Sequence, residues 1–429
     1  MKVVKIPSRS DWSRLVKRPE FEKNELTKVV SNILAEVKSK GDKSLFEFAE
    51  RFDNVKLKTL NVTSQEIEIA VSQVSEELKS AINIAKENIE KFHKSQYITE
   101  PVIETTKGVK CWRKSIGIEK VGLYIPGGSA PLFSTILMLA IPANIAGCKE
   151  IVLCTPPDKE GNINPAILYT ANLIGITQIY KVGGAQAIGS MAFGTETIPQ
   201  VYKIFGPGNQ YVTKAKELIQ QEGVAIDMPA GPSEVLIIAD ETCNPAFVAA
   251  DLLSQAEHGA DSQVILLSDN SQVIEKVTIE LDLQLAQLPR TEIAEKALQN
   301  SKSILLNDLD ECIDFSNEYA PEHLIIASIN ASNYINKIVN AGSVFLGNYS
   351  CESAGDYASG TNHTLPTNGF ARNYSGVSLD SFVKKITFQK LDKEGIKNIG
   401  PAIEIMADAE QLFAHKNAVS LRLKEIKDV

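Results

Sequence analysis

The stretch KVGLYIPGGS, residues 120–129, decides the fold of this chain. A short apolar run ends in proline and two glycines, and an apolar segment from Leu132 to Gly147 follows. A strand, a glycine turn and a helix in this order predict a parallel α/β unit, in which the strand ends and helix amino termini form an anion site.

The same order recurs further along the chain. Residues 179–182 run into GGAQAIG at 183–189, and residues 203–205 run into GPGN at 206–209. Glycine lets the backbone approach a phosphate closely, so these turns favour a nucleotide site. None of them reads GxGxxG with an acidic residue about 20 positions later. A dinucleotide would therefore bind in a nonstandard way.

A second α/β series follows, with helices between its expected strands. These strands are Glu234–Ala239, Gln263–Leu267, Ser303–Leu306, Leu324–Ala327 and Ser343–Leu346. The sequence therefore predicts an α/β protein with two incomplete doubly wound, Rossmann-like domains, which suggests an old duplication.

The two ends of the chain differ from this centre. Residues 1–100 are mostly charged amphipathic helices with a scaffold role, and TSQE at 63–66 predicts a capping box. A β-branched run at 383–388 precedes helices to the C-terminus, which form a small terminal domain carrying Glu410 and His415. Such a domain is a candidate for reaching into a partner subunit.

Composition narrows the class of protein. The 429 residues carry a net charge of −9, 44% hydrophobic residues and 23% charged residues, which is typical of a soluble globular protein. This acidic balance argues against nucleic acid or anionic membrane partners and favours a small-molecule substrate. No signal peptide or membrane span is apparent, and six scattered cysteines without CxxC spacing favour reduced thiols in the cytoplasm.

The segment Ser254–Gly259 is the first candidate site. It closes a helix that we expect to start at the cap Asn244, with Pro245 in the first turn, and to end with Gly259 in a left-handed conformation. Gln255 and His258 would then face the same way. An amide oxygen and an imidazole one turn apart can bind a metal ion together, although a solvent-facing polar stripe gives the same pattern.

Two further pairs of polar residues lie in an expected turn and in an expected loop. Glu322 and His323 precede a strand, where imidazole and carboxylate can divide two proton transfers, unless they are only a surface pair. Asp356 and His363 lie in a Gly/Ser-rich loop, 352–363, that is long for a turn.

A metal shell can be assembled from these parts. Gln255, His258, Asp356 and His415 offer two imidazoles, a carboxylate and an amide, which suits Zn²⁺, or Mn²⁺ and Co²⁺ at higher coordination. His93 lacks an acidic or second imidazole neighbour in the sequence, so we expect an exposed helical residue.

A thiol is an alternative nucleophile. Cys148 and Cys154 bracket an apolar strand, and a thiolate could trap an aldehyde. Neither cysteine has a histidine or lysine beside it, so both are expected to be ordinary buried thiols.

With these motifs in view, the chain resembles the histidinol dehydrogenase family over nearly its whole length. The motifs that carry the resemblance are VGLYIPGG at 121–128, FGPGN at 205–209, AGPSEV at 230–235, SQAEHG at 254–259, PEHL at 321–324, residues 355–363 and HKNAV at 415–419.

The resemblance implies roles for named residues. Gln255, His258, Asp356 and His415 match the zinc ligands, which also bind substrate. Ser233, His323 and Glu410 match other substrate-binding positions, Glu322 and His323 the catalytic acid/base pair, and Tyr124, Gln186 and Asn209 the NAD contacts.

The resemblance also implies an architecture and a reaction. It implies an interlocked homodimer in which residues 377–429 reach the partner's active site. A first α/β domain of residues 21–123 and 233–376 would carry most metal and catalytic residues, residues 124–232 would bind NAD, and residues 1–20 would pack with the C-terminal region. The reaction would be the oxidation of L-histidinol to L-histidine with two NAD⁺, the last step of histidine biosynthesis. A zinc hydrolase and a non-catalytic metal scaffold are the rival interpretations.

Overall fold

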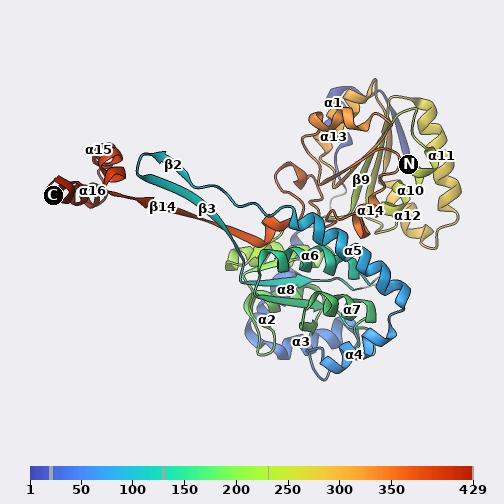
Figure 1. Cartoon of the computed structure of the whole chain (residues 1–429). Coiled ribbons are helices and arrows are strands. Elements are labelled where there is room, and N and C mark those ends of the chain that lie inside the picture. The colour runs from blue at the N-terminus through green and yellow to red at the C-terminus, as the bar shows by residue number, and fades with distance from the viewer. Residues whose placement is uncertain (19–22, 128–130, 230, 428–429) are drawn as a thin grey trace.

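The computed structural model describes residues 1–18, 23–127, 131–229 and 231–427. Two α/β lobes lie against each other, and a slender arm projects from the region where they meet (Figure 1). The expected turn residues Gly128 and Ser129, and Ala230 of the motif at 230–235, lie outside the described residues.

The six-stranded lobe is built on an all-parallel sheet with the order β1-β11-β10-β9-β12-β13. Its strands are β1 (Lys2–Lys5), β9 (Glu234–Ala239), β10 (Gln263–Ser268), β11 (Lys302–Leu305), β12 (His323–Ala327) and β13 (Ser343–Leu346). Its helices are α1 (Arg9–Leu15), α10 (Pro245–Ala256), α11 (Ser271–Leu285), α12 (Thr291–Gln299), α13 (Leu309–Tyr319) and α14 (Glu352–Tyr357).

Alternation along β9 explains why this sheet has helices on both faces. Val235 and Ile237 join the core formed with α10, α11 and α12, whereas Leu236 and Ile238 join the core that contains Trp12 of α1 and residues of α13. Successive side chains of a strand point to opposite faces, so a strand that is apolar throughout must be covered on both.

The five-stranded lobe repeats this plan with the order β6-β5-β4-β7-β8, again all parallel. Its strands are β4 (Lys120–Tyr124), β5 (Glu150–Thr155), β6 (Gln178–Lys181), β7 (Lys203–Phe205) and β8 (Ala225–Ile226). Its helices are α6 (Phe133–Ala146), α7 (Pro165–Ile174), α8 (Gly184–Phe193) and α9 (Gln210–Ile219). The predicted α/β class with parallel sheets is confirmed.

The amino-terminal helices cover the five-stranded lobe. They are α2 (Lys23–Lys40), α3 (Asp42–Phe48), α4 (Ser64–Gln73) and α5 (Glu76–Lys94), with a π-helical turn at Ala49–Asp53. α2 packs on α8 and α9, α4 on α7, and α5 on α6. The family resemblance implied instead a domain of residues 21–123 and 233–376, which would group these helices with the six-stranded sheet. Amphipathic periodicity gives a helix its apolar face but does not say which sheet that face covers.

The arm consists of an antiparallel three-stranded sheet and two helices. It contains β2 (Ile103–Thr106), β3 (Val109–Gly117), β14 (Val383–Leu391), α15 (Lys393–Ala409) and α16 (Phe413–Lys427). α15 and α16 lie at its far end, away from both lobes (Figure 1). Short 3₁₀ turns complete the described elements at Gln220–Glu222, Ala331–Lys337, Phe370–Arg372 and Leu379–Phe382.

The caps of α4 and α10 agree with the sequence-based predictions, whereas the end of α10 differs. The capping box at Thr63 and Glu66 is confirmed, and Asn244 caps α10 by accepting from the N–H of Ala246 at 3.0 Å. The prediction for Gly259 was wrong, because α10 ends at Ala256 and leaves through Glu257 in right-handed geometry. Among the described helices, none is both long and apolar enough to span a membrane.

Candidate active site

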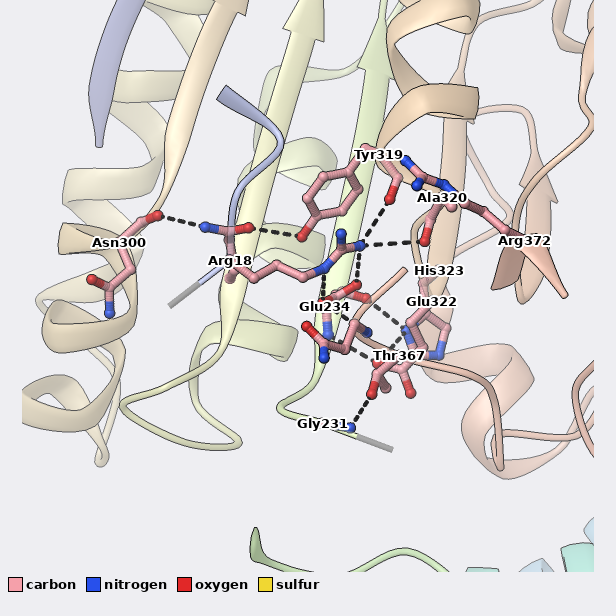
Figure 2. A network of polar contacts seen from close by, with 12 residues as sticks. Arg18, Gly231, Glu234, Asn300, Tyr319, Ala320, Glu322, His323, Thr367 and Arg372 are labelled. Atoms are coloured by element: carbon pink, nitrogen blue, oxygen red, sulfur yellow. Dashed lines mark hydrogen bonds and ion pairs between the residues drawn. The ribbon is translucent and has the colours of Figure 1, made fainter. Parts of the chain in front are cut away.

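The catalytic candidates lie at the amino ends of the strands of the six-stranded sheet. Glu234 begins β9, and His323 begins the neighbouring strand β12. Ser233 lies directly before Glu234. Figure 2 shows Glu234, Glu322 and His323 gathered at this edge. Because the strands are parallel, their amino ends meet at one edge and bring residues far apart in sequence together.

The main chain of Glu234 contacts both members of the predicted catalytic pair. Its N–H donates to a carboxylate oxygen of Glu322 at 2.9 Å, and its carbonyl lies 3.1 Å from Nδ1 of His323. If Nδ1 carries the proton and donates to this carbonyl, Nε2 keeps its lone pair. Burial lowers the pKa of His323 to about 3, so the imidazole is neutral.

Nε2 of His323 is a buried nitrogen with no hydrogen-bond partner among the described residues. It lies 3.7 Å from Oδ1 of Asp356. A buried polar atom without a partner costs free energy, so this nitrogen is suited to a substrate group that donates a proton.

Gln255 is buried and points its amide into the same cluster. Nε2 of Gln255 donates to the carbonyl of Glu234 at 3.2 Å and lies 3.4 Å from a carboxylate oxygen of Glu322. Because the amide nitrogen is engaged in this way, the carbonyl oxygen is the atom left to bind a metal ion or substrate.

A second cluster supplies the charge for a cation. One ligand atom each of His258, Glu352 and Asp356 lies within 4.8 Å of the others. Burial raises the pKa of Asp356 to about 7, and burial together with Asp356 raises that of Glu352 well above its usual range. Two crowded, poorly solvated carboxylates beside an imidazole fit a divalent cation, which would stabilise their charged forms.

Glu352 was not among the site residues predicted from the sequence, although its spacing of four residues from Asp356 would have indicated it. Residues 352–357 form α14 rather than an irregular loop, so Glu352 and Asp356 lie one helical turn apart. Oε2 of Glu352 is buried without a hydrogen-bond partner in the described chain. Reading the Gly/Ser-rich segment as a loop concealed the i, i+4 pair of carboxylates.

His363 anchors this cluster to the other lobe. Its Nδ1 lies 2.9 Å from the main-chain carbonyl of Asp356, and its Nε2 lies 3.0 Å from the hydroxyl of Thr135 in α6. Nδ1 therefore donates to the carbonyl and Nε2 accepts from the hydroxyl.

His93 differs from the prediction of an exposed residue. It is fully buried in α5, where Nδ1 lies 2.9 Å from the carbonyl of Ile89 and Nε2 lies 3.4 Å from the amide of Asn362. Burial lowers the pKa of His93 below its ordinary value. The loop that packs on α5 comes from residues far away in sequence, so local charge pattern could not reveal this burial.

Two predicted site residues lie elsewhere in the chain. Glu410 caps the end of α15 and His415 lies in α16, both exposed at the far end of the arm. Figure 1 shows these helices well away from α10 and α14. A single chain therefore does not bring His415 or Glu410 to Gln255, His258 and Asp356.

The predicted NAD contacts line one cavity of about 1270 Å³ in the five-stranded lobe. The hydroxyl of Tyr124, at the carboxyl end of β4, accepts from the N–H of Gly184 at 3.0 Å. Asn209 caps α9 by accepting from the N–H groups of Tyr211 and Val212. Gln186 lies in the first turn of α8. The cavity is large enough for a dinucleotide and is flanked by two helix amino termini that suit a pyrophosphate.

The amino-terminal helical region also lines this cavity, which the scaffold interpretation did not foresee. Arg51, Asp53 and Glu66 are among the lining residues. Burial raises the pKa of Asp53 to about 6. By contrast, the thiols Cys148 and Cys154 are not activated, because burial raises the pKa of each to about 12.

These features define a class of protein: a two-sheet α/β enzyme with a nucleotide-sized cavity at one sheet and a histidine–carboxylate cluster at the other. The family model for histidinol dehydrogenase matches residues 16–423. The histidinol dehydrogenase of Bacteroides thetaiotaomicron is 60% identical over 427 residues, covering 100% of both chains. That of Escherichia coli K12 is 51% identical over 418 residues, covering 97% of this chain and 95% of its own.

A solved structure gives the same result. The crystal structure of histidinol dehydrogenase from Elizabethkingia anophelis superposes with a TM-score of 0.98 at 62% identity, covering 100% of this chain and 99% of that chain. The chain belongs to the histidinol dehydrogenase family, as its motifs had suggested, and is a dehydrogenase.

Proposed function

We propose that this chain oxidises L-histidinol to L-histidine through L-histidinaldehyde, using two NAD⁺, as the last step of histidine biosynthesis. Family membership supports the substrate. The single structural observation that carries the proposal is the free, buried Nε2 of His323, which lies beside the carboxylate of Asp356 and next in sequence to Glu322.

In the first oxidation, Nε2 of His323 accepts the hydroxyl proton while the carbon's hydride passes to the nicotinamide of NAD⁺. When Nδ1 carries the proton and donates to the carbonyl of Glu234, the lone pair stays on Nε2, and the same bond stabilises the imidazolium that forms. The products are the aldehyde, NADH and a protonated His323.

In the second oxidation, Glu322 removes a proton from water as the water oxygen bonds to the aldehyde carbon, and the protonated His323 returns its proton to the aldehyde oxygen, which makes His323 neutral again. The resulting hydrate loses its hydroxyl proton to His323 and its hydride to a second NAD⁺, which yields the acid. Burial raises the pKa of the Glu322 carboxyl well above its usual range, which makes its carboxylate a stronger base. The aldehyde stays bound between the two steps.

Zinc, one ion per subunit, fits the cluster and would polarise and orient the amino alcohol when bound. His258, Asp356 and the amide oxygen of Gln255 would hold it, together with His415 of a neighbouring copy. The same residues, with Ser233, His323, Glu410 and His415, would line the substrate site.

The exposed arm supports a homodimer with shared sites. Glu410 ends α15 and His415 lies in α16, and these two helices lie far from α10 and α14 of the same chain (Figure 1). Both residues would therefore complete the site of a neighbouring copy and interlock the two subunits. Residues 124–232 supply NAD binding through Tyr124, Gln186 and Asn209, and residues 377–429 supply the crossing segment. The enzyme acts in the cytoplasm.

Formation of NADH from histidinol tests the proposal. The zinc-loaded protein is expected to form two NADH for each histidinol consumed. NADH is measured by its absorbance and compared with the amount of histidine produced. A zinc hydrolase would form no NADH. A metal-stabilised scaffold would also form none and would tolerate changes at Glu322 and His323 without consequence.

A further inference from the structure

Arg18 forms a buried network directly behind the catalytic pair. Its guanidinium makes a forked ion pair with the Glu234 carboxylate, with one of the two bonds at 2.9 Å. The Arg18 side chain is 14% exposed and that of Glu234 is 2% exposed. Figure 2 shows the guanidinium facing Glu234, with the ring of Tyr319 beside it. The guanidinium carbon lies 3.9 Å from the centroid of that ring.

Glu234 links Arg18 to three functional side chains. Its carboxylate is fixed by Arg18 and by the N–H of Asn368 at 3.0 Å. Its main-chain N–H and carbonyl are the groups that contact Glu322, His323 and Gln255. A displacement of Glu234 therefore moves the partners of the acid/base pair and of the expected amide ligand together.

Arg18 also holds the turn that leads into the pair. It donates to the carbonyls of Tyr319 at 2.9 Å and Ala320 at 3.3 Å. Ala320 has a φ of 55°, a left-handed conformation that is unfavourable for a residue with a Cβ atom. Only Pro321 separates this turn from Glu322, so the guanidinium supports the pair from a second side.

Stability alone does not explain the buried ion pair between Arg18 and Glu234. Burial of a guanidinium–carboxylate pair costs desolvation free energy that the attraction between the charges only partly offsets. Its bonds converge on the two segments that carry Glu234 and Glu322. Arginine alone has the planar fork for two carboxylate oxygens together with further donors for carbonyls.

We propose that Arg18 is a positioning residue for both oxidations. It acts through Glu234 and the turn at 319–320 to hold Glu322 and His323 in their reactive geometry. It touches neither substrate nor metal. The inference rests on the proposed function, because its readout is histidinol oxidation.

The test compares Arg18→Ala and Arg18→Lys with Arg14→Ala in the full-length, zinc-loaded protein. Arg14 is an exposed arginine of the same segment that pairs with Asp11 across one helical turn, so it controls for loss of a cation there. Folding is followed by circular dichroism and zinc by elemental analysis. Each half-reaction is started separately from histidinol and from histidinaldehyde.

Arg18→Ala is expected to lower kcat by about 10- to 100-fold in both half-reactions, because a small misplacement of catalytic groups carries such a cost. With kcat expressed per zinc-bound site, KM should stay close to wild type. Added guanidinium chloride at low millimolar concentration should restore part of the lost activity of Arg18→Ala. Arg18→Lys should remain impaired because an ammonium cannot reproduce the fork, and Arg14→Ala should behave as wild type.

Other outcomes overturn the proposal. One is a kcat near wild type in folded Arg18→Ala or Arg18→Lys. Another is a loss of activity that unfolded or zinc-free protein explains wholly. A third is a loss of kcat in Arg18→Ala that added guanidinium does not lessen. If Arg18→Ala fails to fold, Arg18→Lys alone decides by its kcat. A failure of the proposed function is distinguishable, because wild type and Arg14→Ala would then also form no NADH.

Discussion

The imidazole of His363 donates from Nδ1 to the main-chain carbonyl of Asp356 at 2.9 Å. Through Nε2 the same ring contacts Thr135 of α6, so one side chain joins the carboxylate cluster of the six-stranded lobe to a helix of the five-stranded lobe. The site therefore depends on contacts between the lobes as well as on each sheet.

His363→Asn should weaken zinc binding, because Asp356 loses the donor that orients its peptide. Loss of such a supporting partner typically costs about 10- to 100-fold in metal affinity. Competition with a chelating dye measures the dissociation constant. Thr135→Val removes only the second contact and should have a smaller effect. Equal affinity in wild type and His363→Asn would show that this bond has no role in the metal site.

Glu322→Gln should separate the two oxidations. Only the second oxidation needs a base for water, so the rate from histidinaldehyde should fall by about 100-fold or more while the first turnover from histidinol is much less affected. His323→Asn should depress both. Rapid-mixing measurement of the first and second NADH distinguishes these cases. Comparable losses in both half-reactions of Glu322→Gln would refute this division of labour.

Asp356→Asn and Glu352→Gln test the carboxylate pair. Removing the charge of Asp356 should lower zinc affinity by more than about 100-fold, and removing that of Glu352 by about 10-fold. Glu241→Gln, at an exposed glutamate, serves as the control. Unchanged zinc content in both site variants after dialysis against a chelator would place the ion elsewhere.

The burial of His93 predicts a pH dependence of stability. Its folded pKa is lowered by burial, so the folded state resists protonation while the unfolded chain accepts a proton near pH 6.5. The free energy of unfolding should therefore fall as pH decreases below about 6.5, by at most about 1.4 kcal/mol per pH unit for this one proton. Urea titrations of wild type and His93→Gln measure the difference. Parallel pH profiles would show that His93 does not contribute.

Local signals in the sequence predicted much of the fold. The side chain of Asn244 caps α10, Thr63 and Glu66 form their box, and the expected strand at 234–239 is observed with the same bounds. These features depend on residues within a few positions of each other or on a continuous apolar run, both of which are visible in a single sequence.

Features that depend on distant contacts were not predicted. Buried His93 contacts Asn362, 269 positions away, and Arg18 pairs with Glu234, 216 positions away. Glu352 was overlooked because the segment after Cys351 was read as a loop. His415 was assigned to the metal shell from its ligand chemistry and from the family resemblance, and no contact within the single chain shows this role, because α16 lies far from α10 and α14 (Figure 1).

The shared active site can be tested directly by mixing two inactive variants, His323→Asn and His415→Asn. If His415 of the partner subunit completes each site, a mixed dimer contains one site with both native residues. Equal amounts, dissociated and reassociated with zinc, should recover roughly a quarter of wild-type NADH formation from histidinol, since half the dimers are mixed and one of their two sites is intact. No recovery in mixed dimers that demonstrably form would contradict an active site built from two chains.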